Sequence, residues 1–468
     1  MKQLDAYYVK KLNPRDQYLI QVPGSKSITN RAFLLAALSG KRCVLTGVLF
    51  SDDTRGFLDC LLQLGFKVNI EEDKCRVTIQ GTSGVIPNQK ASLNVRSAGT
   101  AARFLTVALA FAGGGYSLDS SKQMRKRPME PILKILEQLH VKLEFKNEMY
   151  HFPFDLCSEI NCSDRNEITI DTSLSSQFAS ALLMAACILP KGLKIHLTGS
   201  RSSGSYIKMT LAMMKQFGIQ VGRLEDGYEI AHQVGWGLSE YGIEPDVSAA
   251  CYFYAMVPLL KTSVIVKNVY EDSLQGDIQF LNVLEQMGCH RENTEDGIRL
   301  TMSEQQMHGV DVSMKDFSDQ TMTLAAIAPF ADGVTKIGQI GHIRFQESDR
   351  IKAILTELGR MGVRCEEVPE INGIQIFPLQ GYCADNLANV NCTTTADAQT
   401  DSSEAVAPDI KISSDNITDA IKIETYEDHR MAMAFTLAGL KTGKLIIKNP
   451  GCCRKTFEHY FDVIDSLY

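Results

Sequence analysis

One pattern recurs along the chain about every 70 to 78 residues, and it restricts the possible folds more than any other feature. Each copy is an amphipathic helical segment that stops at Gly, or once at His, and is followed by a strand-like run. A second, more apolar helical segment recurs with the same spacing. Its six copies begin near Ser27, Gly99, Ser176, Val247, Gln320 and Arg430. This repeat predicts six α/β units, three in each half of the chain.

The length and composition are those of a globular protein with more than one domain. The chain has 468 residues, of which 44% are hydrophobic and 22% are charged. A net charge of −7 argues against a broad nucleic-acid-binding surface. The 13 cysteines form no CxxC pair, so we expect reduced thiols. The N-terminus lacks a signal-peptide core, and no apolar run reaches the roughly 18 residues of a membrane span, so we expect a cytoplasmic protein.

The repeat is interrupted once, before its last copy. The spacing there is longer by about 30 residues, and the excess lies in residues 382–408, which are rich in Thr, Asp, Ala and Ser and have no hydrophobic period. We expect a surface insertion. A role in binding a partner is the alternative.

The first apolar helix predicts an anion site. A strand-like run, Leu19–Val22, leads through a Pro-Gly turn to Lys26, Ser27 and Arg31. Free backbone N–H groups, the positive end of the helix dipole and two cations would then meet at one point. The alternative is an ordinary buried helix with a serine N-cap.

The other helices also begin with polar or charged motifs. If the apolar helices of each half run parallel, these motifs face one cleft that contains many cations but few acids, mainly Asp53, Asp319 and Glu347. Such a cleft suits two small polyanionic substrates held side by side. The motifs include Arg96–Arg103, Gln123–Pro128, Leu174–Phe178, Gln346–Arg350, Tyr426–Arg430 and Arg454–Phe457.

Each of these side chains also has a structural interpretation. Arg103 and Arg430 are candidates for buried ion pairs with Asp428 or Asp349, and Asp428 is the better candidate. Four other residues are candidates for simple helix caps or exposed first-turn residues, namely Ser175, Ser176, Asp319 and Glu347.

Taken together and in order, eight motifs resemble those of the 5-enolpyruvylshikimate-3-phosphate (EPSP) synthase family of enolpyruvyl transferases. The resemblance covers essentially the whole chain apart from residues 382–408. The motifs are Pro23–Arg31, Ala98–Arg103, Lys126–Met129, Ser175–Gln177, Asp319, Glu347–Arg350, Asp428–Ala432 and Lys455–Phe457.

The resemblance implies a two-lobed fold with three repeated α/β units per lobe around buried parallel helices. In this family one lobe is inserted into the other. We therefore expect residues 1–22 and 245–468 to form one lobe, with its insertion at 382–408, and residues 23–244 to form the second. A hinge is expected near Val22.

The resemblance also implies a reaction. Family members transfer the enolpyruvyl group of phosphoenolpyruvate to the 5-hydroxyl of 3-phosphoshikimate by addition and elimination, and release phosphate. This is a step of chorismate and aromatic amino-acid biosynthesis and the target of glyphosate. It uses no metal or organic cofactor. We expect a monomer that acts on these two small molecules, without a nucleic-acid or membrane partner.

Residue roles follow from the matching positions. By resemblance Glu347 handles the methylene proton, Asp319 takes the hydroxyl proton, and Lys26 lies between the substrates. The residues implied for phosphoenolpyruvate are Lys26, Gly99, Arg127, Gln177, Arg350, Arg430 and Lys455. Those implied for 3-phosphoshikimate are Lys26, Ser27, Arg31, Ser175, Ser176, Gln177, Ser203, Asp319 and Gln346, and Arg201 is a neighbour of Ser203.

The chain departs from the family pattern at several positions. Gln346 stands where many members have Lys, so one substrate contact is weaker or comes from Arg344. His342 replaces a common Asn, Arg96-Ser97 replaces Gly-Asn, and Phe104 replaces a frequent Pro beside Gly99. Two alternatives remain. One is the related transferase for UDP-N-acetylglucosamine, whose usual reactive Cys is missing from the loop 119–127. The other is an inactive homologue that acts as a binding protein.

Overall fold

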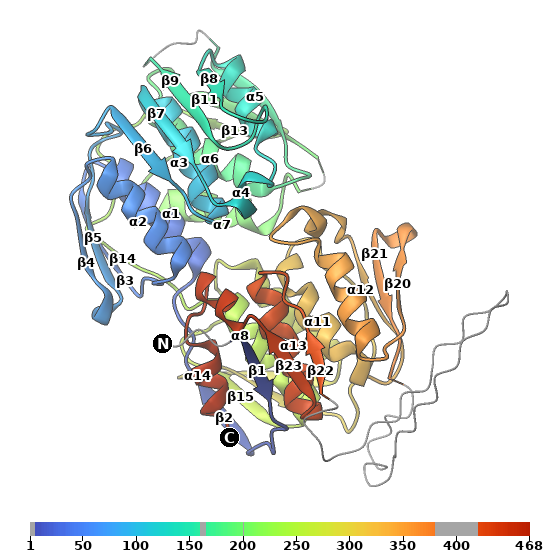
Figure 1. Cartoon of the computed structure of the whole chain (residues 1–468). Coiled ribbons are helices and arrows are strands. Elements are labelled where there is room, and N and C mark those ends of the chain that lie inside the picture. Colours follow the sequence, from blue (N-terminus) through green and yellow to red (C-terminus); the bar gives the residue numbers. More distant parts are fainter. Residues whose placement is uncertain (1–4, 160–164, 200, 380–419) are drawn as a thin grey trace, which may run out of the picture.

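The computed structural model describes residues 5–159, 165–199, 201–379 and 420–468. It has two lobes, which Figure 1 shows one above the other, with both chain ends in the lower lobe. The strands in these residues form six sheets, and each sheet combines one parallel strand pair with antiparallel pairing. Helices connect these strands, which confirms the predicted α/β class.

The second unit shows how a sheet is built. Strand β6 (Lys90–Asn94) is followed by the buried helix α3 (Gly99–Ala112), and strand β7 (Gly114–Asp119) returns parallel to β6. A shorter amphipathic helix and an antiparallel hairpin then complete the sheet in the order β6-β7-β9-β8. These later elements are α4 (Lys122–Arg125), α5 (Glu130–Gln138), β8 (Lys142–Phe145) and β9 (Phe154–Ser158).

The third and fifth units repeat this order of elements, and in both the strand after the buried helix lies parallel to the strand before it. The third contains β10 (Glu167–Asp171), α6 (Ser176–Ala186), β11 (Leu193–Thr198), α7 (Ser205–Gln216), β12 (Gly222–Arg223) and β13 (Gly227–Ile230). The fifth contains β18 (Asp311–Ser313), α11 (Thr321–Ile327), β19 (Thr335–Gly338), α12 (Arg350–Arg360), β20 (Cys365–Val368) and β21 (Gly373–Ile376).

The first and fourth units begin with their buried helices. The first contains α1 (Lys26–Leu38), β3 (Arg42–Thr46), α2 (Asp52–Gln63), β4 (Val68–Glu71) and β5 (Arg76–Gln80). The fourth contains α8 (Val247–Tyr254), α9 (Met256–Leu260), β15 (Ser263–Val266), α10 (Phe280–Gln286), β16 (Cys289–Thr294) and β17 (Gly297–Met302).

These two units exchange their first strands, and the exchange joins the lobes. Strand β2 (Gln17–Ile20) runs towards α1 but pairs in parallel with β15. Strand β14 (Glu240–Gly242) runs towards α8 but pairs in parallel with β3. Each strand therefore completes the sheet of the lobe that the chain is leaving.

The sixth unit is completed by the beginning of the chain. Strands β22 (Ile421–Ile423) and β23 (Leu445–Lys448) are parallel and flank helix α13 (His429–Thr442). Strand β1 (Ala6–Val9) adds antiparallel to β23, and helix α14 (Tyr460–Asp465) follows near the C-terminus. The expected insertion at 382–408 lies outside the described residues.

The two segments that cross between the lobes are hydrogen-bonded to each other. The Ser25 N–H donates to the Glu244 carbonyl at 2.8 Å, and the Asp246 N–H donates to the Pro23 carbonyl at 2.8 Å. Gly24 lies in this crossing, where a Cβ would stand 1.9 Å from the Gly47 carbonyl oxygen. Only glycine fits this close backbone approach. The crossing places Lys26, the first residue of α1, at the cleft.

Each lobe has its own apolar core. One cluster of buried residues extends from Ile28 to Ile243. The other combines residues between Val9 and Val22 with residues between Val247 and Leu467. In the first core α3 packs against α1 and α6, and in the second α13 packs against α8 and α11. These apolar helices are buried on nearly every face, as their all-round hydrophobicity predicts.

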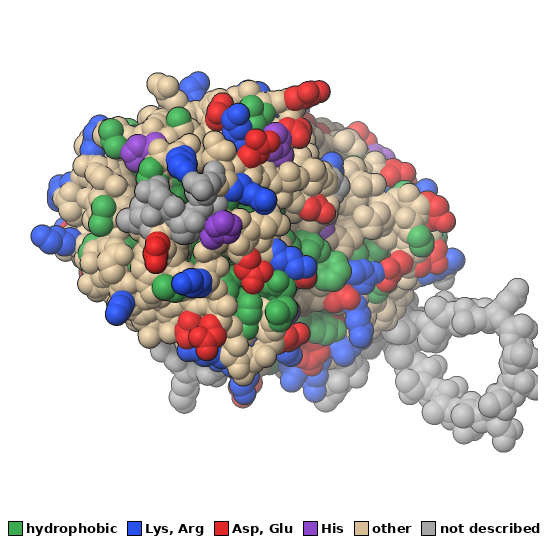
Figure 2. Space-filling view, turned by 90° about the horizontal axis from the view of Figure 1, so that it is seen from above, with side chains coloured by type: hydrophobic (Ala, Val, Ile, Leu, Met, Phe, Trp, Pro, Cys, Tyr) green, Lys and Arg blue, Asp and Glu red, His purple; other side chains and the backbone are tan. Residues whose placement is uncertain are grey.

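The sequence predicts the starts of the buried helices closely. Three begin at the predicted residues Gly99, Ser176 and Val247, and the other three begin within one residue of them. No helix in the described part of the chain is long and apolar enough to cross a membrane. Acidic and basic side chains are interspersed on the face that Figure 2 shows.

Candidate active site

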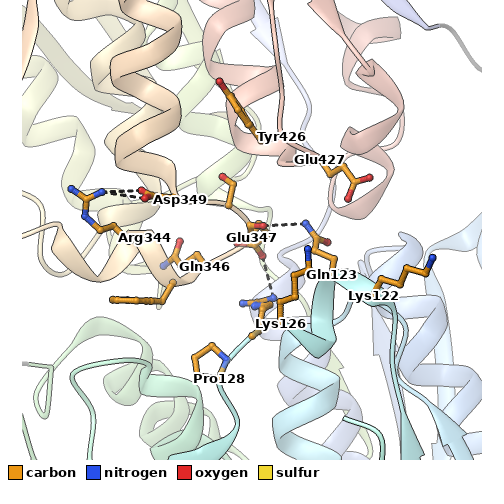
Figure 3. Close-up of a pocket in the computed structure, with 13 residues that line it drawn as sticks. Lys122, Gln123, Lys126, Pro128, Arg344, Gln346, Glu347, Asp349, Tyr426 and Glu427 are labelled. Carbon is orange, nitrogen blue, oxygen red and sulfur yellow. Dashed lines mark hydrogen bonds and ion pairs between the residues drawn. The ribbon is translucent and has the colours of Figure 1, made fainter. Parts of the chain in front are cut away.

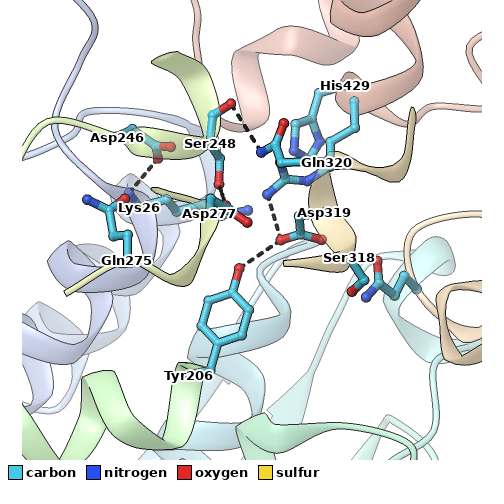
Figure 4. Close-up of polar contacts among 12 residues, drawn as sticks. Lys26, Tyr206, Asp246, Ser248, Gln275, Asp277, Ser318, Asp319, Gln320 and His429 are labelled. Carbon is cyan, nitrogen blue, oxygen red and sulfur yellow. Dashed lines mark hydrogen bonds and ion pairs between the residues drawn. The ribbon is translucent and has the colours of Figure 1, made fainter. Parts of the chain in front are cut away.

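Asp319 lies where three cleft elements meet. It belongs to the short 3-10 turn Ser318–Gln320 before α11. One carboxylate oxygen accepts from Arg350 Nη1 at 3.1 Å, and the other accepts from Arg430 Nη2 and from the Tyr206 hydroxyl, both at 2.8 Å. Figure 4 shows Tyr206 reaching Asp319 from helix α7 of the other lobe. Burial raises the pKa of Asp319, but Arg430 and Arg350 outweigh it and lower the pKa to about 2.

Glu347 is the second carboxylate, and it precedes α12. Its Oε2 contacts Arg350 Nη2 at 2.9 Å, while its Oε1 lies 3.5 Å from Lys455 Nζ and 3.6 Å from Arg127 Nη1. Gln123 also donates to the Glu347 carbonyl at 3.1 Å, as Figure 3 shows. Burial raises the pKa of this carboxyl group, but the surrounding cations hold it well below its usual value. Both acids are therefore ionised in this arrangement.

Arg350 is the cation that connects the two acids. Its side chain is only 1% exposed and also contacts Asp428, with Nε 2.8 Å from Oδ2. Asp428 is fully buried and caps α13 by accepting from the Arg430 N–H at 3.0 Å. The structural role predicted for Asp428 is confirmed. The partner expected for it is wrong, because Asp428 pairs with Arg350 while Arg430 pairs with Asp319.

Lys26 is the first residue of α1, directly after the crossing between the lobes. Its Nζ lies 3.4 Å from Asp53 Oδ2, and its backbone N–H donates to Asp246 Oδ2 at 3.1 Å. The serine N-cap of the alternative interpretation is wrong, because Ser25 makes no side-chain capping bond. Asp246, which also caps α8 through the Ala249 N–H at 3.0 Å, supplies the carboxylate from across the crossing.

Gly99 is the place where backbone and guanidinium groups approach most closely. A Cβ at this position would stand 2.6 Å from the Nη1 atoms of both Arg103 and Arg127, so only glycine leaves these cations in place. Arg103 is buried and donates to the carbonyls of Gly99 and Pro128. Burial and the neighbouring Arg127 lower the pKa of Arg103 well below its usual value. The ion pair suggested for Arg103 is wrong, since carbonyl oxygens serve instead.

Arg31 is fully enclosed beside the cleft. Its guanidinium donates to the hydroxyls of Thr210 at 2.8 Å and Ser180 at 3.2 Å, and to the Ser27 carbonyl at 3.0 Å. The Phe104 ring lies 5.4 Å from the guanidinium carbon. Phe104, which stands where the family has a frequent Pro, therefore packs against Arg31. Burial lowers the pKa of Arg31 to about 10.

The serines predicted to bind phosphate line the start of two helices in the same lobe. Ser175 caps α6 by accepting from the Gln177 N–H at 3.2 Å, which confirms the capping interpretation for Ser175. Ser176 is buried, and the Gln177 Oε1 is buried without a hydrogen-bond partner. Ser203 is exposed in the turn before α7. Within the described residues, no hydrogen bond or ion pair joins these side chains to Asp319 or Glu347.

Gln346 and Arg344 differ in what they contact. The Gln346 amide oxygen accepts from Arg350 Nη1. Arg344 instead contacts both carboxylate oxygens of Asp349, at 3.1 and 3.2 Å, and also Glu367. Figure 3 shows Arg344 turned towards Asp349. Two acids already neutralise Arg344, which argues against the idea that it replaces the family's lysine.

Tyr206, which contacts Asp319, was missed by sequence reasoning. Two other residues of the site lie in motifs that the sequence singled out, but they were given no role. Gln123 contacts Glu347, and both ring nitrogens of His429 are buried without a hydrogen-bond partner. Burial, followed by Lys26 and Arg430, holds the pKa of His429 well below its usual value. Tyr206 opens an amphipathic helix, and its position beside Ser203 was the available signal.

A pocket of about 410 Å³ adjoins Glu347. Lys122, Lys126 and Arg127 line it from the upper lobe, and Glu347 and Glu427 line it from the lower lobe. Among the residues that the structure describes, no cluster of three or more His, Cys, Asp or Glu side chains is arranged to hold a metal ion. The site therefore contains two carboxylates among several cations, an arrangement that suits proton transfer to and from anionic substrates.

Comparison with known proteins identifies relatives along the whole chain. A solved structure of EPSP synthase from Acinetobacter baumannii superposes with a TM-score of 0.74 at 21% sequence identity, covering 98% of this chain and 97% of that one. This likeness confirms the two-lobed fold.

The sequence relatives are more similar. The 3-phosphoshikimate 1-carboxyvinyltransferase of Nostoc punctiforme is 37% identical over 459 residues, covering 98% of both chains. The chloroplastic enzyme of that name from Arabidopsis thaliana is 33% identical over 465 residues, covering 96% of this chain and 82% of the relative. The family model for EPSP synthase (3-phosphoshikimate 1-carboxyvinyltransferase) matches residues 17–464. The chain therefore belongs to the EPSP synthase family, and the predicted enolpyruvyl transferase activity is confirmed at the level of the family.

Proposed function

We propose that the cleft between the lobes transfers the enolpyruvyl group of phosphoenolpyruvate to the 5-hydroxyl of 3-phosphoshikimate, with Glu347 and Asp319 as proton carriers. The observation that supports this most is the arrangement of two ionised, half-buried carboxylates that share Arg350 and are surrounded by Arg127, Arg430 and Lys455. Cations in this number bind phosphate and carboxylate groups, and the two acids supply the acid–base chemistry.

Phosphoenolpyruvate is assigned to the cations around Glu347. Its phosphate and carboxylate groups would pair with guanidinium and ammonium groups that Glu347 now contacts, while the Gly99 backbone leaves room beside Arg127. The full proposed set is Lys26, Gly99, Arg127, Gln177, Arg350, Arg430 and Lys455.

3-Phosphoshikimate is assigned to the neighbouring side of the cleft, with its 5-hydroxyl at Asp319. The contact between Tyr206 and Asp319 adds Tyr206 to this side, because its hydroxyl already fixes the carboxylate. The other proposed contacts are Lys26, Ser27, Arg31, Ser175, Ser176, Gln177, Ser203 and Gln346.

The addition step needs one proton donor and one proton acceptor. The acceptor's 5-oxygen bonds to carbon 2 of phosphoenolpyruvate and passes its proton to Asp319, while the methylene carbon takes a proton from Glu347. In the elimination step the methyl group returns a proton to Glu347. The bond from carbon 2 to the phosphate oxygen then breaks, and phosphate leaves with the proton held by Asp319.

Glu347 must be protonated before addition, and its contacts suggest how. Bound phosphoenolpyruvate competes for Arg127 and Lys455, which are the longer contacts of Glu347. When these cations turn to the substrate, the pKa of Glu347 rises, because burial alone raises it. The substrate thereby prepares its own proton donor.

The second candidate function is that of a binding protein without turnover. Gln346, which replaces a charged family residue and accepts from Arg350, is the observation that favours it. The chain retains Glu347, Asp319 and Lys26, the residues proposed to act in catalysis, and this favours an active enzyme over a binding protein.

One assay separates the two functions. Phosphate release is followed with phosphoenolpyruvate and 3-phosphoshikimate together and with each alone. Release that requires both substrates supports the enzyme. The absence of release at high protein concentration, with both substrates bound in a separate titration, supports the binding protein.

We also propose that the two cores are two domains, residues 1–22 with 245–468 and residues 23–244, and that the chain works as a cytoplasmic monomer. One chain supplies every residue assigned above, which supports a monomer. Sedimentation equilibrium at assay concentrations tests this, and a dimer mass would contradict it.

A further inference from the structure

A second pocket between the lobes is the starting point. It has a volume of about 240 Å³ and is lined by residues of both lobes. Arg201, next to Ser173 and Leu174, comes from the lobe of α6 and α7, and Lys315 and His342 come from the lobe of α11 and α12. The lining contains two cationic side chains and no acid. Such a lining attracts an anion.

Arg201 is the unusual member of this pocket. It is only 8% exposed, and within the described residues its guanidinium has no ion pair or side-chain hydrogen bond. Burial lowers the pKa of Arg201, and the negative charge of Asp319 is the largest influence that opposes this shift. The guanidinium N–H groups of Arg201 are not fully enclosed, so a ligand in the pocket can reach them.

His342 is a neutral donor or acceptor in the same pocket. Its Nε2 lies 2.8 Å from the Ser318 hydroxyl, next to Asp319 in the chain. Burial and then Arg201 lower the pKa of His342 to about 3, so the ring is uncharged. Lys315 is half-buried, and within the described part of the chain it has no salt bridge. The positive charge of the pocket therefore comes from Arg201 and Lys315.

The pocket stands where a phosphate group is needed. The acceptor in the proposed reaction carries its phosphate on the same ring as the hydroxyl assigned to Asp319. Gln346 has no charge to offer, and Arg344 is neutralised by Asp349 and Glu367. Arg201 interacts with the negative charge of Asp319, and within the described residues it forms no ion pair with an acid.

We propose that Arg201 and Lys315, with the imidazole of His342, bind the 3-phosphate of the acceptor in place of the lysine that this chain lacks at Gln346. The proposal rests on the proposed function. It assigns the phosphate to groups from both lobes, so that the acceptor draws the lobes together. The turn that carries Arg201 is already attached to the other lobe, because the Ser205 hydroxyl donates to the Asp316 carbonyl at 2.5 Å.

The test compares two ligands that differ only in the phosphate. Dissociation constants for 3-phosphoshikimate and shikimate are measured by titration of the full-length protein, its Arg201→Gln and Lys315→Gln variants, and an Arg344→Gln control. We expect Arg201→Gln to weaken 3-phosphoshikimate binding by roughly tenfold to a hundredfold, because a charge-assisted contact is lost. Shikimate binding should change by less than about twofold to threefold, within the effect of an ordinary surface substitution. Lys315→Gln should act in the same direction with a smaller effect. Arg344→Gln should leave the ratio of the two constants unchanged.

Two outcomes would overturn the proposal. In one, the ratio of the two dissociation constants stays the same in Arg201→Gln, either because neither ligand is affected or because both are weakened equally. In the other, Arg344→Gln removes the discrimination instead. Equal weakening would mean that Arg201 only supports the fold. Failure of the proposed function is distinct, since the unmodified protein would then neither bind 3-phosphoshikimate nor release phosphate.

Discussion

Asp319 and Glu347 share Arg350 but are held differently. Asp319 has two guanidinium contacts at 2.8 and 3.1 Å and a phenol hydroxyl at 2.8 Å. Glu347 has one close contact, to Arg350, and two longer ones. The more loosely held carboxylate is the one that a competing anion can free from its cations. This difference supports Glu347 as the group that gains a proton and Asp319 as the group that remains ionised until it receives one.

Replacing Glu347 with Gln tests its role in turnover. Glu347→Gln should lower kcat by about a hundredfold or more, because it removes a proton carrier. The KM for phosphoenolpyruvate should stay equal or fall, since the substitution also removes a competitor for Arg127 and Lys455. Steady-state kinetics with both substrates measures these constants.

Glu427→Gln is the matched control, because Glu427 lines the same pocket and is exposed. It should leave kcat and KM within about twofold, as expected for a surface substitution. If Glu347→Gln raises KM and keeps kcat, Glu347 is an anchor and the proposed role fails.

The pKa of Glu347 predicts proton uptake on substrate binding. The cations depress this pKa before phosphoenolpyruvate binds, and the substrate takes part of that charge, so the pKa is higher in the complex. A group whose pKa rises on binding takes up protons at pH values between its two pKa values, and its contribution to affinity grows as pH falls through that range. Calorimetry in two buffers of different ionisation enthalpy measures the uptake.

The phosphate of phosphoenolpyruvate also titrates and contributes to the measured proton uptake. The contribution of Glu347 is therefore the difference in uptake between the unmodified protein and Glu347→Gln. The unmodified protein should take up more protons than Glu347→Gln at the same pH. Equal uptake in the two proteins would show that Glu347 does not change its protonation when phosphoenolpyruvate binds.

At the scale of elements, the helix starts were predictable and their partners were not. Gly stops and apolar periodicity are local signals, so the start of α3 at Gly99 could be read directly. The cap of α1 is a tertiary contact with Asp246, which is distant in sequence. The same holds for Arg201, whose significance depends on the neutralisation of Arg344 by Asp349 and Glu367.

Two helix caps should differ strongly in their effect on stability. Asp428 caps α13, is fully buried and pairs with Arg350, whereas Asp349 caps α12, is exposed and pairs with Arg344. Asp428→Asn should lower the free energy of unfolding by about 3 kcal/mol, because it breaks a buried ion pair. Asp349→Asn should cost less than about 1 kcal/mol, since asparagine also caps helices and exposed pairs contribute little.

Urea unfolding of both variants measures these free energies. Equal losses would mean that Arg350 is satisfied by Asp319 and Glu347 alone. Arg350 would then not depend on Asp428 for its position.

At the scale of the molecule, the repeat predicted six units but not how they are shared between the lobes. Periodicity predicts whether a segment is a helix or a strand, but it does not predict which strand pairs with which. From the sequence, β2 and β14 resemble ordinary first strands of the units that follow them. Their exchange is a pairing choice between distant strands, with β15 and β3 as partners. A hinge near Val22 is expected from the resemblance. The two crossing segments are joined close to that point by hydrogen bonds between Pro23 and Asp246 and between Ser25 and Glu244.

The contacts across the cleft predict a movement of the lobes. Apart from the crossing, the lobes meet through polar contacts such as Tyr206 with Asp319 and Arg55 with Glu458, the latter at 3.1 Å and partly exposed. Partly exposed ion pairs contribute about 1 kcal/mol or less each, so the lobes can separate at modest cost. Anions bound between cations of both lobes favour closure. We therefore expect 3-phosphoshikimate to lower the radius of gyration in small-angle scattering.

Tyr206→Phe sharpens this prediction, because it removes one contact between the lobes and keeps the ring. The variant should have a larger radius of gyration than the unmodified protein without substrate and should approach the same value with 3-phosphoshikimate and phosphoenolpyruvate. Tyr241→Phe is the control, since the Tyr241 hydroxyl donates to Gln216 within one lobe at 2.9 Å. A radius that does not respond to substrate in any of the three proteins would mean that the lobes are fixed, and the cations of both lobes would then have to receive the substrates without closing.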